Sequence, residues 1–207
     1  MPKKFLLTLF FTLVYFSGIA QKLRVEEKTL FLTQLANKAQ GVTTLKADFR
    51  QEKYLDILAD KIISEGQIIL KAPSKLKWAY KTPFEYTVIL TGQEILINDE
   101  GQKTEFKIES NKIFKQVSEM VINSVKGNLI DEEQFDARYF KEGANYRVEL
   151  APLEEAMSMY FDRIILFINP SFLVTNIQLI EPSGDYTTIQ FDKHIINADI
   201  KEDEFTL

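Results

Sequence analysis

The side chains that most often carry out enzymatic chemistry are scarce in this chain. It contains one histidine, His194, no cysteine and no G-x-S-x-G motif. A lone histidine can act as a general base only with a nucleophile or a metal ion beside it. Alternate side chains of a strand point to opposite faces, so His194 shares a face with Asp192. The other face then carries Ile189, Phe191 and Ile195. We therefore expect His194 to be a surface residue without a catalytic role.

The acidic residues do not form a recognisable metal or catalytic site either. A metal site needs several histidines, cysteines or clustered carboxylates. The densest acidic cluster, DEEQFD at 131–136, follows Gly127 and Asn128, which indicates a solvated loop or the start of a short helix. A glycosidase needs only two carboxylates, but no pair stands out among the 30 acidic side chains. We expect no metal, no cofactor and no enzymatic activity; a secreted hydrolase that uses carboxylates stays an alternative.

The first twenty residues differ in character from the rest. Lys3 and Lys4 precede the uncharged run FLLTLFFTLVYF and the small-residue stretch SGIA, the three-part layout of a secretory signal peptide. The apolar run is short for a membrane anchor, which needs about 20 residues. We expect cleavage after Ala20, which leaves one soluble, exported domain over residues 21–207. No cysteine is available to carry a lipid anchor or to form disulfides.

Composition and charge limit the class of protein. Charged residues make up 27% and hydrophobic residues 45% of the 207 residues, which is typical of a globular domain with a substantial core. The 16 Phe, 8 Tyr and one Trp favour a β-rich fold. Without residues 1–20 the chain has 23 basic and 30 acidic side chains, a formal charge of −7. An acidic chain without a basic tract is a poor nucleic-acid binder.

Two segments have a helical pattern. The first, residues 25–41, ends at Gly41, and the second, residues 111–126, lies between Asn111 as a helix start and Gly127 as a stop. Each carries an apolar stripe at helical spacing. These stripes comprise Leu32, Leu35, Ala36 and Ala39 in the first helix and Ile113, Phe114, Val117, Met120, Val121, Ser124 and Val125 in the second.

The rest of the chain alternates with a period of two. TLKADFRQ, SEGQIILK, KLKWAY, YTVIL, EILIN and TEFKIES precede the second helix, and ARYF, YRVEL, DRIILFI, LVTNIQLI and YTTIQFDKHI follow it. In TEFKIES, Phe106 and Ile108 share a face. Gly, Asp and Asn between such short runs are typical of antiparallel hairpins. We expect a mainly β (α+β) domain of roughly ten strands and two helices, with no linker or internal repeat.

The stretch KLKWAY raises the question of what its apolar face touches. Leu76, Trp78 and Tyr80 share one face of the strand, while Lys75 and Lys77 lie on the other. We expect the two lysines to face water or a partner. Each apolar residue alone is explained by an ordinary core, whereas the set as a whole is compatible with a cavity.

Three stretches resemble the periplasmic outer-membrane lipoprotein carrier family, the LolA-like proteins. An F-x-Q motif at Phe49–Gln51 follows the first helix, and the motif G-x-(apolar)-x-(apolar)-K-x-P-x-K-(apolar)-K/R-W is similar to Gly66–Trp78, with Pro83 after it. The motifs are weak singly, but their order and spacing extend over nearly the whole mature chain. The family's ending is matched by Gly184, Thr188, Ile189, Phe191, Asn197, Ile200 and Phe205.

The resemblance implies an incomplete antiparallel β-barrel, a strongly curved open sheet whose apolar concave face is covered by lid helices. It also implies a soluble monomeric carrier in the periplasm. Such a carrier takes acylated lipoproteins from an inner-membrane lipoprotein-releasing transporter and passes them to an outer-membrane receptor. The better-known carriers have an arginine just before the proline of the tryptophan strand, where it helps to hold the lid shut. Here that place is Ala72, so the lid latch does not carry over.

We expect an acyl-binding groove on the concave face, with the helix 111–126 packed over Leu76 and Trp78. A carrier of another lipid, glycolipid or polyene intermediate on the same fold is the main alternative, and a structural envelope protein with a filled core is another. The expected groove residues are Phe49, Ile68, Leu70, Leu76, Trp78, Tyr80, Val88 and Leu90 on the strands and Phe114, Val117 and Met120 on the helix.

Overall fold

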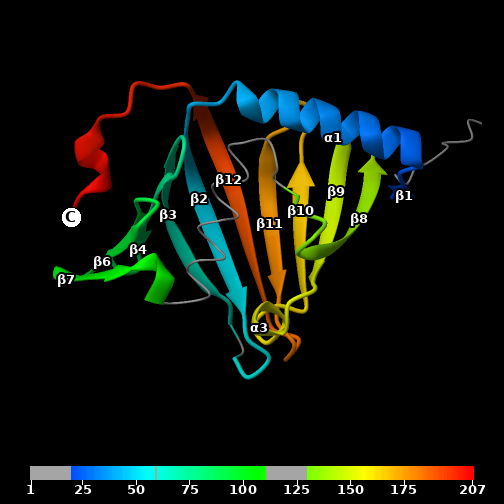
Figure 1. Ribbon diagram of the computed structural model, residues 1–207. Coiled ribbons are helices and arrows are strands. Elements are labelled where there is room, and N and C mark those ends of the chain that lie inside the picture. The colour runs from blue at the N-terminus through cyan, green and yellow to red at the C-terminus, as the bar shows by residue number, and fades with distance from the viewer. Residues whose placement is uncertain (1–19, 59, 111–129) are drawn as a thin grey trace, which may run out of the picture.

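One long antiparallel sheet with a helix across one end of its strands makes up most of the structure. The structure is a computed structural model in which residues 20–58, 60–110 and 130–207 are described. Helix α1 (Val25–Gln40) runs across the ends of several strands (Figure 1). The signal peptide expected over 1–20, apart from Ala20, and the helix expected over 111–126 lie outside the described residues. No helix of the described part has the length and apolar character needed to cross a membrane.

The sheet has twelve strands in the order β1-β8-β9-β10-β11-β12-β2-β3-β4-β5-β6-β7, every pair antiparallel. β12 pairs with β2, which joins the two ends of the chain in the middle of the sheet. β1 and β7 are its edges, so the sheet is an open, incomplete barrel, as the sequence predicts. The strands are β1 (Gln21–Lys22), β2 (Thr44–Tyr54), β3 (Ile62–Lys71), β4 (Lys75–Thr82), β5 (Tyr86–Leu90), β6 (Glu94–Asp99), β7 (Gln102–Lys107), β8 (Phe135–Glu142), β9 (Asn145–Pro152), β10 (Arg163–Ile168), β11 (Val174–Ile180) and β12 (Tyr186–Ile196).

Short helices not expected from the sequence complete the described part. They are η1 (Ile108–Ser110), α3 (Glu155–Ser158) and η2 (Glu202–Phe205). β7 ends at Lys107, so Ile108 begins η1 and does not continue the strand as predicted, but Phe106 and Ile108 still pack in the same apolar cluster. The sequence predicts roughly ten strands, and β1, with two residues, is too short to give a pattern.

Helix α1 is fixed at both ends by its own residues. The backbone N–H of Arg24 donates to the Glu27 carboxylate at 3.0 Å, and the Gly41 N–H donates to the Lys38 carbonyl. Its most buried residues are Phe31 and Leu35. The predicted stripe includes Leu35 but omits Phe31, which is 1% exposed and is the main anchor of the helix.

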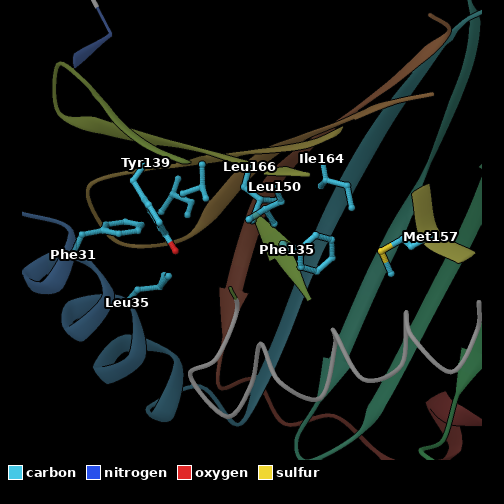
Figure 2. Packing of buried hydrophobic residues seen from close by; sticks show 10 residues of the cluster. Phe31, Leu35, Phe135, Tyr139, Leu150, Met157, Ile164 and Leu166 are labelled. Atoms are coloured by element: carbon cyan, nitrogen blue, oxygen red, sulfur yellow. The ribbon is translucent and has the colours of Figure 1, made fainter. Parts of the chain in front are cut away.

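Two apolar clusters share one face of the sheet, which we call the inner face. The lid cluster joins Phe31 and Leu35 of α1 to strands β8–β10 (Figure 2). The groove cluster continues over strands β12 and β2–β6 and the start of η1; its buried members are Ala47, Phe49, Ile68, Leu70, Leu76, Leu90, Ile95, Ile108, Ile189 and Phe191. Three residues of β11, Val174, Ile177 and Leu179, contact both clusters, so the apolar inner face is continuous. The buried members of the lid cluster are Phe31, Leu35, Phe135, Tyr139, Val148, Leu150, Met157, Ile164, Leu166 and Ile168.

The opposite, outer face has a smaller core made with the C-terminal segment. Ile69 of β3 and Ile89 of β5 pack against Ile200 and Phe205. Because side chains alternate along a strand, Ile69 faces away from its neighbours in the groove cluster. The C-terminal segment, red in Figure 1, therefore covers the back of strands whose other face belongs to the groove cluster.

A β-bulge in β12 overturns the predicted placement of Ile195. Asp192 pairs with Asp48 and Ile195 pairs with Lys46, so two residues of β12 stand where β2 has one. Lys193 takes up the extra length in a left-handed conformation, with φ 52°. Ile195 therefore lies on the outer face and is 52% exposed, and it does not share a face with Phe191.

Candidate functional site

The structure gathers all eight strand residues expected in the groove into one cluster. Three of them, Trp78, Tyr80 and Val88, are only partly buried. The three helical residues expected there, Phe114, Val117 and Met120, lie outside the described residues. The buried members of the expected set are Phe49, Ile68, Leu70, Leu76 and Leu90.

Strand register explains why these side chains meet. Residues directly opposite each other on neighbouring strands share a face and contact one another. Three rows cross β2 to β5 in this way: Phe49–Gly66–Tyr80–Tyr86, Ala47–Ile68–Trp78–Val88 and Leu45–Leu70–Leu76–Leu90. A period of two in each strand therefore produces a continuous apolar surface across four strands.

Gly66 makes room for the aromatic part of the cluster. A Cβ atom at this position would lie 2.1 Å from the Ala79 carbonyl oxygen and 2.6 Å from Cζ of Phe49. The Phe49 ring thus lies over the bare backbone of β3. Its centroid is 4.8 Å from that of Trp78 and 5.1 Å from that of Tyr80, within the range of favourable aromatic pairs.

Two polar groups of aromatic residues sit within this apolar surface. The Tyr80 hydroxyl donates to Oε1 of Gln51 at 3.0 Å. Burial raises the pKa of this hydroxyl, an effect that Trp78 and Gln51 partly oppose. The indole nitrogen of Trp78 is shielded from solvent and has no hydrogen-bond partner within the described part of the chain.

The cluster also contains residues that the sequence-based set omits. Ile189 and Phe191 of β12 are buried in it, and Phe191 lies edge-on to Trp78 at 6.0 Å. Alternation in β12 was sufficient to place both on the apolar face. Ala47, Ile95 and Ile108 are further buried members.

The lysines of β4 lie on the outer face, as predicted, and are partly exposed, but they also pair with acidic residues of the chain's own C-terminal segment. Lys75 pairs with Glu202, and Lys77 Nζ lies 3.0 Å from Oε2 of Glu204. Lys71 also reaches Glu202, at 2.7 Å. Hydrogen bonds from Lys71 and Lys75 lower the pKa of Glu202 to about 2. The chain's own C-terminal segment therefore occupies these positive charges.

His194 and the acidic stretch 131–136, the first candidates for chemistry, make contacts within the fold. His194 lies in the β12 bulge, and its Nε2 atom is 3.1 Å from the Val174 carbonyl oxygen. Glu132, in the acidic stretch 131–136, binds Lys28 of α1 and the Tyr139 hydroxyl, both at 2.6 Å. Over residues 20–58, 60–110 and 130–207, no group of three or more His, Cys, Asp or Glu side chains is arranged to hold a metal ion.

Known proteins resemble this chain in sequence. Residues 40–207 match the family model described as outer membrane lipoprotein carrier protein LolA. The chain belongs to the LolA family. Outer-membrane lipoprotein carrier proteins of Pseudomonas paraeruginosa and Pseudomonas aeruginosa are 27% identical to it over 176 residues, which is 84% of this chain and 80% of theirs.

Solved structures of LolA-like shape are more distant. A LolA superfamily protein from Nitrosomonas europaea is 10% identical, with a TM-score of 0.47 over 85% of this chain and 97% of that one. The MucA/MucB complex of Pseudomonas aeruginosa gives 12% identity and a TM-score of 0.49 over 86% of this chain and 60% of that chain. At these TM-scores neither likeness bears on function.

One position departs from the LolA-like pattern. Ala72 stands before Pro73, where the better-known carriers have an arginine, and it lies between β3 and β4. Its backbone N–H donates to the Thr43 carbonyl at 2.8 Å. Its methyl side chain has no hydrogen-bond donor, so a side-chain latch from this position is absent.

Proposed function

We propose that this LolA-family chain is a soluble periplasmic carrier that shields the acyl chains of lipoproteins. In this proposal it receives them from an inner-membrane lipoprotein-releasing transporter and passes them to an outer-membrane receptor. The observation that carries the proposal is the groove cluster. The buried anchors of α1 belong to the lid cluster, and several groove residues, Trp78 and Val88 among them, are only partly buried.

The energetics of acyl transfer fit a carrier better than an enzyme. Burying one methylene stabilises binding by about 0.8 kcal/mol, so a long acyl chain gains on the order of 10 kcal/mol. Such cargo does not enter water unaided but moves to another apolar site. No bond has to be made or broken, so we propose that the carrier is non-enzymatic and needs no cofactor. We also propose that it acts as a monomer. The donor and acceptor proteins then need to differ from the carrier only in their affinity for the same acyl chain.

Export belongs to the same proposal. The layout of residues 1–20 supports a signal peptide cleaved after Ala20, with Gln21 as the mature N-terminus. Mass determination of the exported protein would give the mature form beginning at Gln21. Recovery of the chain with residues 1–20 intact would contradict the proposed processing.

Native mass spectrometry of the exported protein tests the carrier function directly. We expect co-purification of an acylated lipoprotein, and loss of that species when Val88 on the inner face is replaced by Asp. Replacement of the neighbouring Thr87, on the outer face, should retain it. If a free lipid, glycolipid or polyene co-purifies instead, the same groove carries a different cargo. An empty protein that also rejects acyl probes would indicate a structural role.

A further inference from the structure

The groove cluster contains one buried donor that makes no hydrogen bond of normal geometry. In the part of the chain that the structure describes, the indole Nε1–H of Trp78 is the single buried side-chain N or O atom without a hydrogen-bond partner. It is also shielded from solvent, so bulk water does not satisfy it. Native proteins leave few such groups unpaired, because a buried donor without an acceptor destabilises the fold.

The surroundings of Trp78 are mainly aromatic rings. Phe49 lies 4.8 Å away, Phe191 6.0 Å and Tyr80 6.5 Å, measured between ring centroids. The Tyr80 hydroxyl donates to Gln51 and keeps lone pairs that can accept, but it makes no hydrogen bond of normal geometry with the indole N–H. The Trp78 N–H is therefore the donor of this cluster that a better-placed ligand acceptor would satisfy.

The chemistry of the site restricts what that ligand group can be. A hydrocarbon chain fits the apolar rows but has no acceptor. A phosphate or carboxylate has acceptors, but burying its charge among aromatic rings is costly. The carbonyl of an ester or amide is neutral and accepts a hydrogen bond, and it is the group that joins an acyl chain to the rest of a lipid or lipoprotein.

We propose that the Trp78 N–H donates a hydrogen bond to the acyl carbonyl of the bound cargo. The groove then selects acyl esters and amides over alkyl chains of equal length, and the carbonyl fixes how far the chain enters. This inference rests on the proposed acyl-carrier function, because it assigns a polar contact to the same groove. It makes Trp78 a specificity-determining residue and not merely a part of the wall.

A matched pair of amphiphiles tests the contact. Palmitoyl lysophosphatidylcholine and its O-hexadecyl ether analogue differ at the carbonyl alone. Titrations below the micelle concentration should show that the protein binds the ester roughly threefold to tenfold more tightly, as one net hydrogen bond predicts. Because Trp78 is the only tryptophan of the chain, its fluorescence emission reports the same contact, and the ester should shift it relative to the ether.

An isosteric replacement supplies the control. In a tryptophan auxotroph, benzothienylalanine replaces Trp78 alone and puts sulfur in place of the N–H. The ester preference should disappear while affinity for the ether is retained. If the isostere fails to fold, Trp78→Phe, which also removes ring area from the groove wall, should bind both amphiphiles more weakly but without a preference for the ester. A preference that survives either replacement, or a parent protein that binds both amphiphiles equally, would overturn the proposal for Trp78 and leave the carrier function intact. If the parent binds neither amphiphile, both proposals fall.

Discussion

The ammonium of Lys77 lies 3.0 Å from the carboxylate of Glu204, although 127 residues separate them in sequence. This pair joins β4 to η2, beside the pairs that Lys71 and Lys75 make with Glu202. The ring of Phe205 is buried at 3% exposure, and its centroid lies 5.7 Å from the Lys75 ammonium. The C-terminal segment thus forms a back wall behind the strands whose inner face carries the groove cluster.

The apolar contact should dominate the stability of this back wall. We expect Phe205→Ala to lower the free energy of unfolding by roughly 3–5 kcal/mol, because a buried aromatic ring is lost. Lys77→Ala should cost about 1 kcal/mol or less, because ion pairs open to solvent contribute little. Urea denaturation measures both. Lys77→Ala should also bind a fluorescent acyl probe like the parent. Loss of probe binding in that variant would indicate that acyl chains bind the outer face of β4 and not the inner face.

The Glu202 carboxylate should make the back wall sensitive to acid. Hydrogen bonds from Lys71 and Lys75 lower its pKa from 4.5 to about 2 in the folded protein. Its contribution is therefore complete above the unfolded value of 4.5 and is lost as pH falls through about 2. We expect the parent to have a slightly higher melting temperature than Glu202→Gln at about pH 6, and the two melting temperatures to become equal near pH 2. Since Glu202 is 65% exposed, the gap should be small and should shrink in high salt. A gap that widens as pH falls would contradict this assignment.

The inner face could be predicted from sequence because strand alternation is strict. Leu76 and Trp78 share a face on any regular strand, and register then aligns them with Leu90 and Val88. The same rule fails at Ile195, because the bulge at Lys193 adds one residue and reverses the alternation after it. No residue type in FDKHII announces that bulge.

Contacts between distant segments were harder to predict than faces. Periodicity assigns Lys77 to the outer face but contains no information that Glu204 will meet it there, since that contact depends on how the chain leaves β12. Helix phase is also less certain than strand phase: the predicted stripe of α1 includes Leu35, but a small rotation brings Phe31 to its centre. The missing hydrogen bond of the Trp78 indole nitrogen could not be predicted from sequence, because it depends on which side chains surround that nitrogen.

Glycine at position 66 should be required for the aromatic packing of the groove. Gly66→Ala would bring a Cβ atom within 2.1 Å of the Ala79 carbonyl oxygen and against Phe49. We expect a loss of roughly 1–3 kcal/mol or more in urea denaturation, because backbone and ring must both move. Gly41→Ala is the matched control: its Cβ would meet only the Lys38 carbonyl oxygen at 3.5 Å, an ordinary contact. Equal stability of the two variants would show that β3 and β4 can separate freely.

Helix α1 should depend on Phe31 rather than on its exposed apolar neighbour. The centroid of the Phe31 ring lies 4.5 Å from that of Tyr146. It lies 6.1 Å from that of Tyr139, which is labelled with Phe31 in Figure 2. We expect Phe31→Ala to cost roughly 3–5 kcal/mol and Leu30→Ala, which is 59% exposed, about 0.5 kcal/mol or less. Thermal and urea unfolding followed by circular dichroism measures both. A larger effect at Leu30 would mean that α1 docks through another face.

The two faces of β5 provide the sharpest test of the groove. Val88 lies on the inner face between Trp78 and Ile97, whereas Thr87 lies on the outer face between Ala79 and Asn98. Val88→Asp places an unpaired carboxylate against the apolar rows, and we expect it to weaken binding of a fluorescent fatty-acyl probe about tenfold or more. Thr87→Asp adds the same charge one residue away and should leave probe affinity within about twofold, because it does not reach the groove. Circular dichroism confirms that both variants fold before titration. If the folded Val88→Asp protein binds the probe like the parent while Thr87→Asp loses it, acyl chains bind the outer face and the groove cluster is an ordinary core.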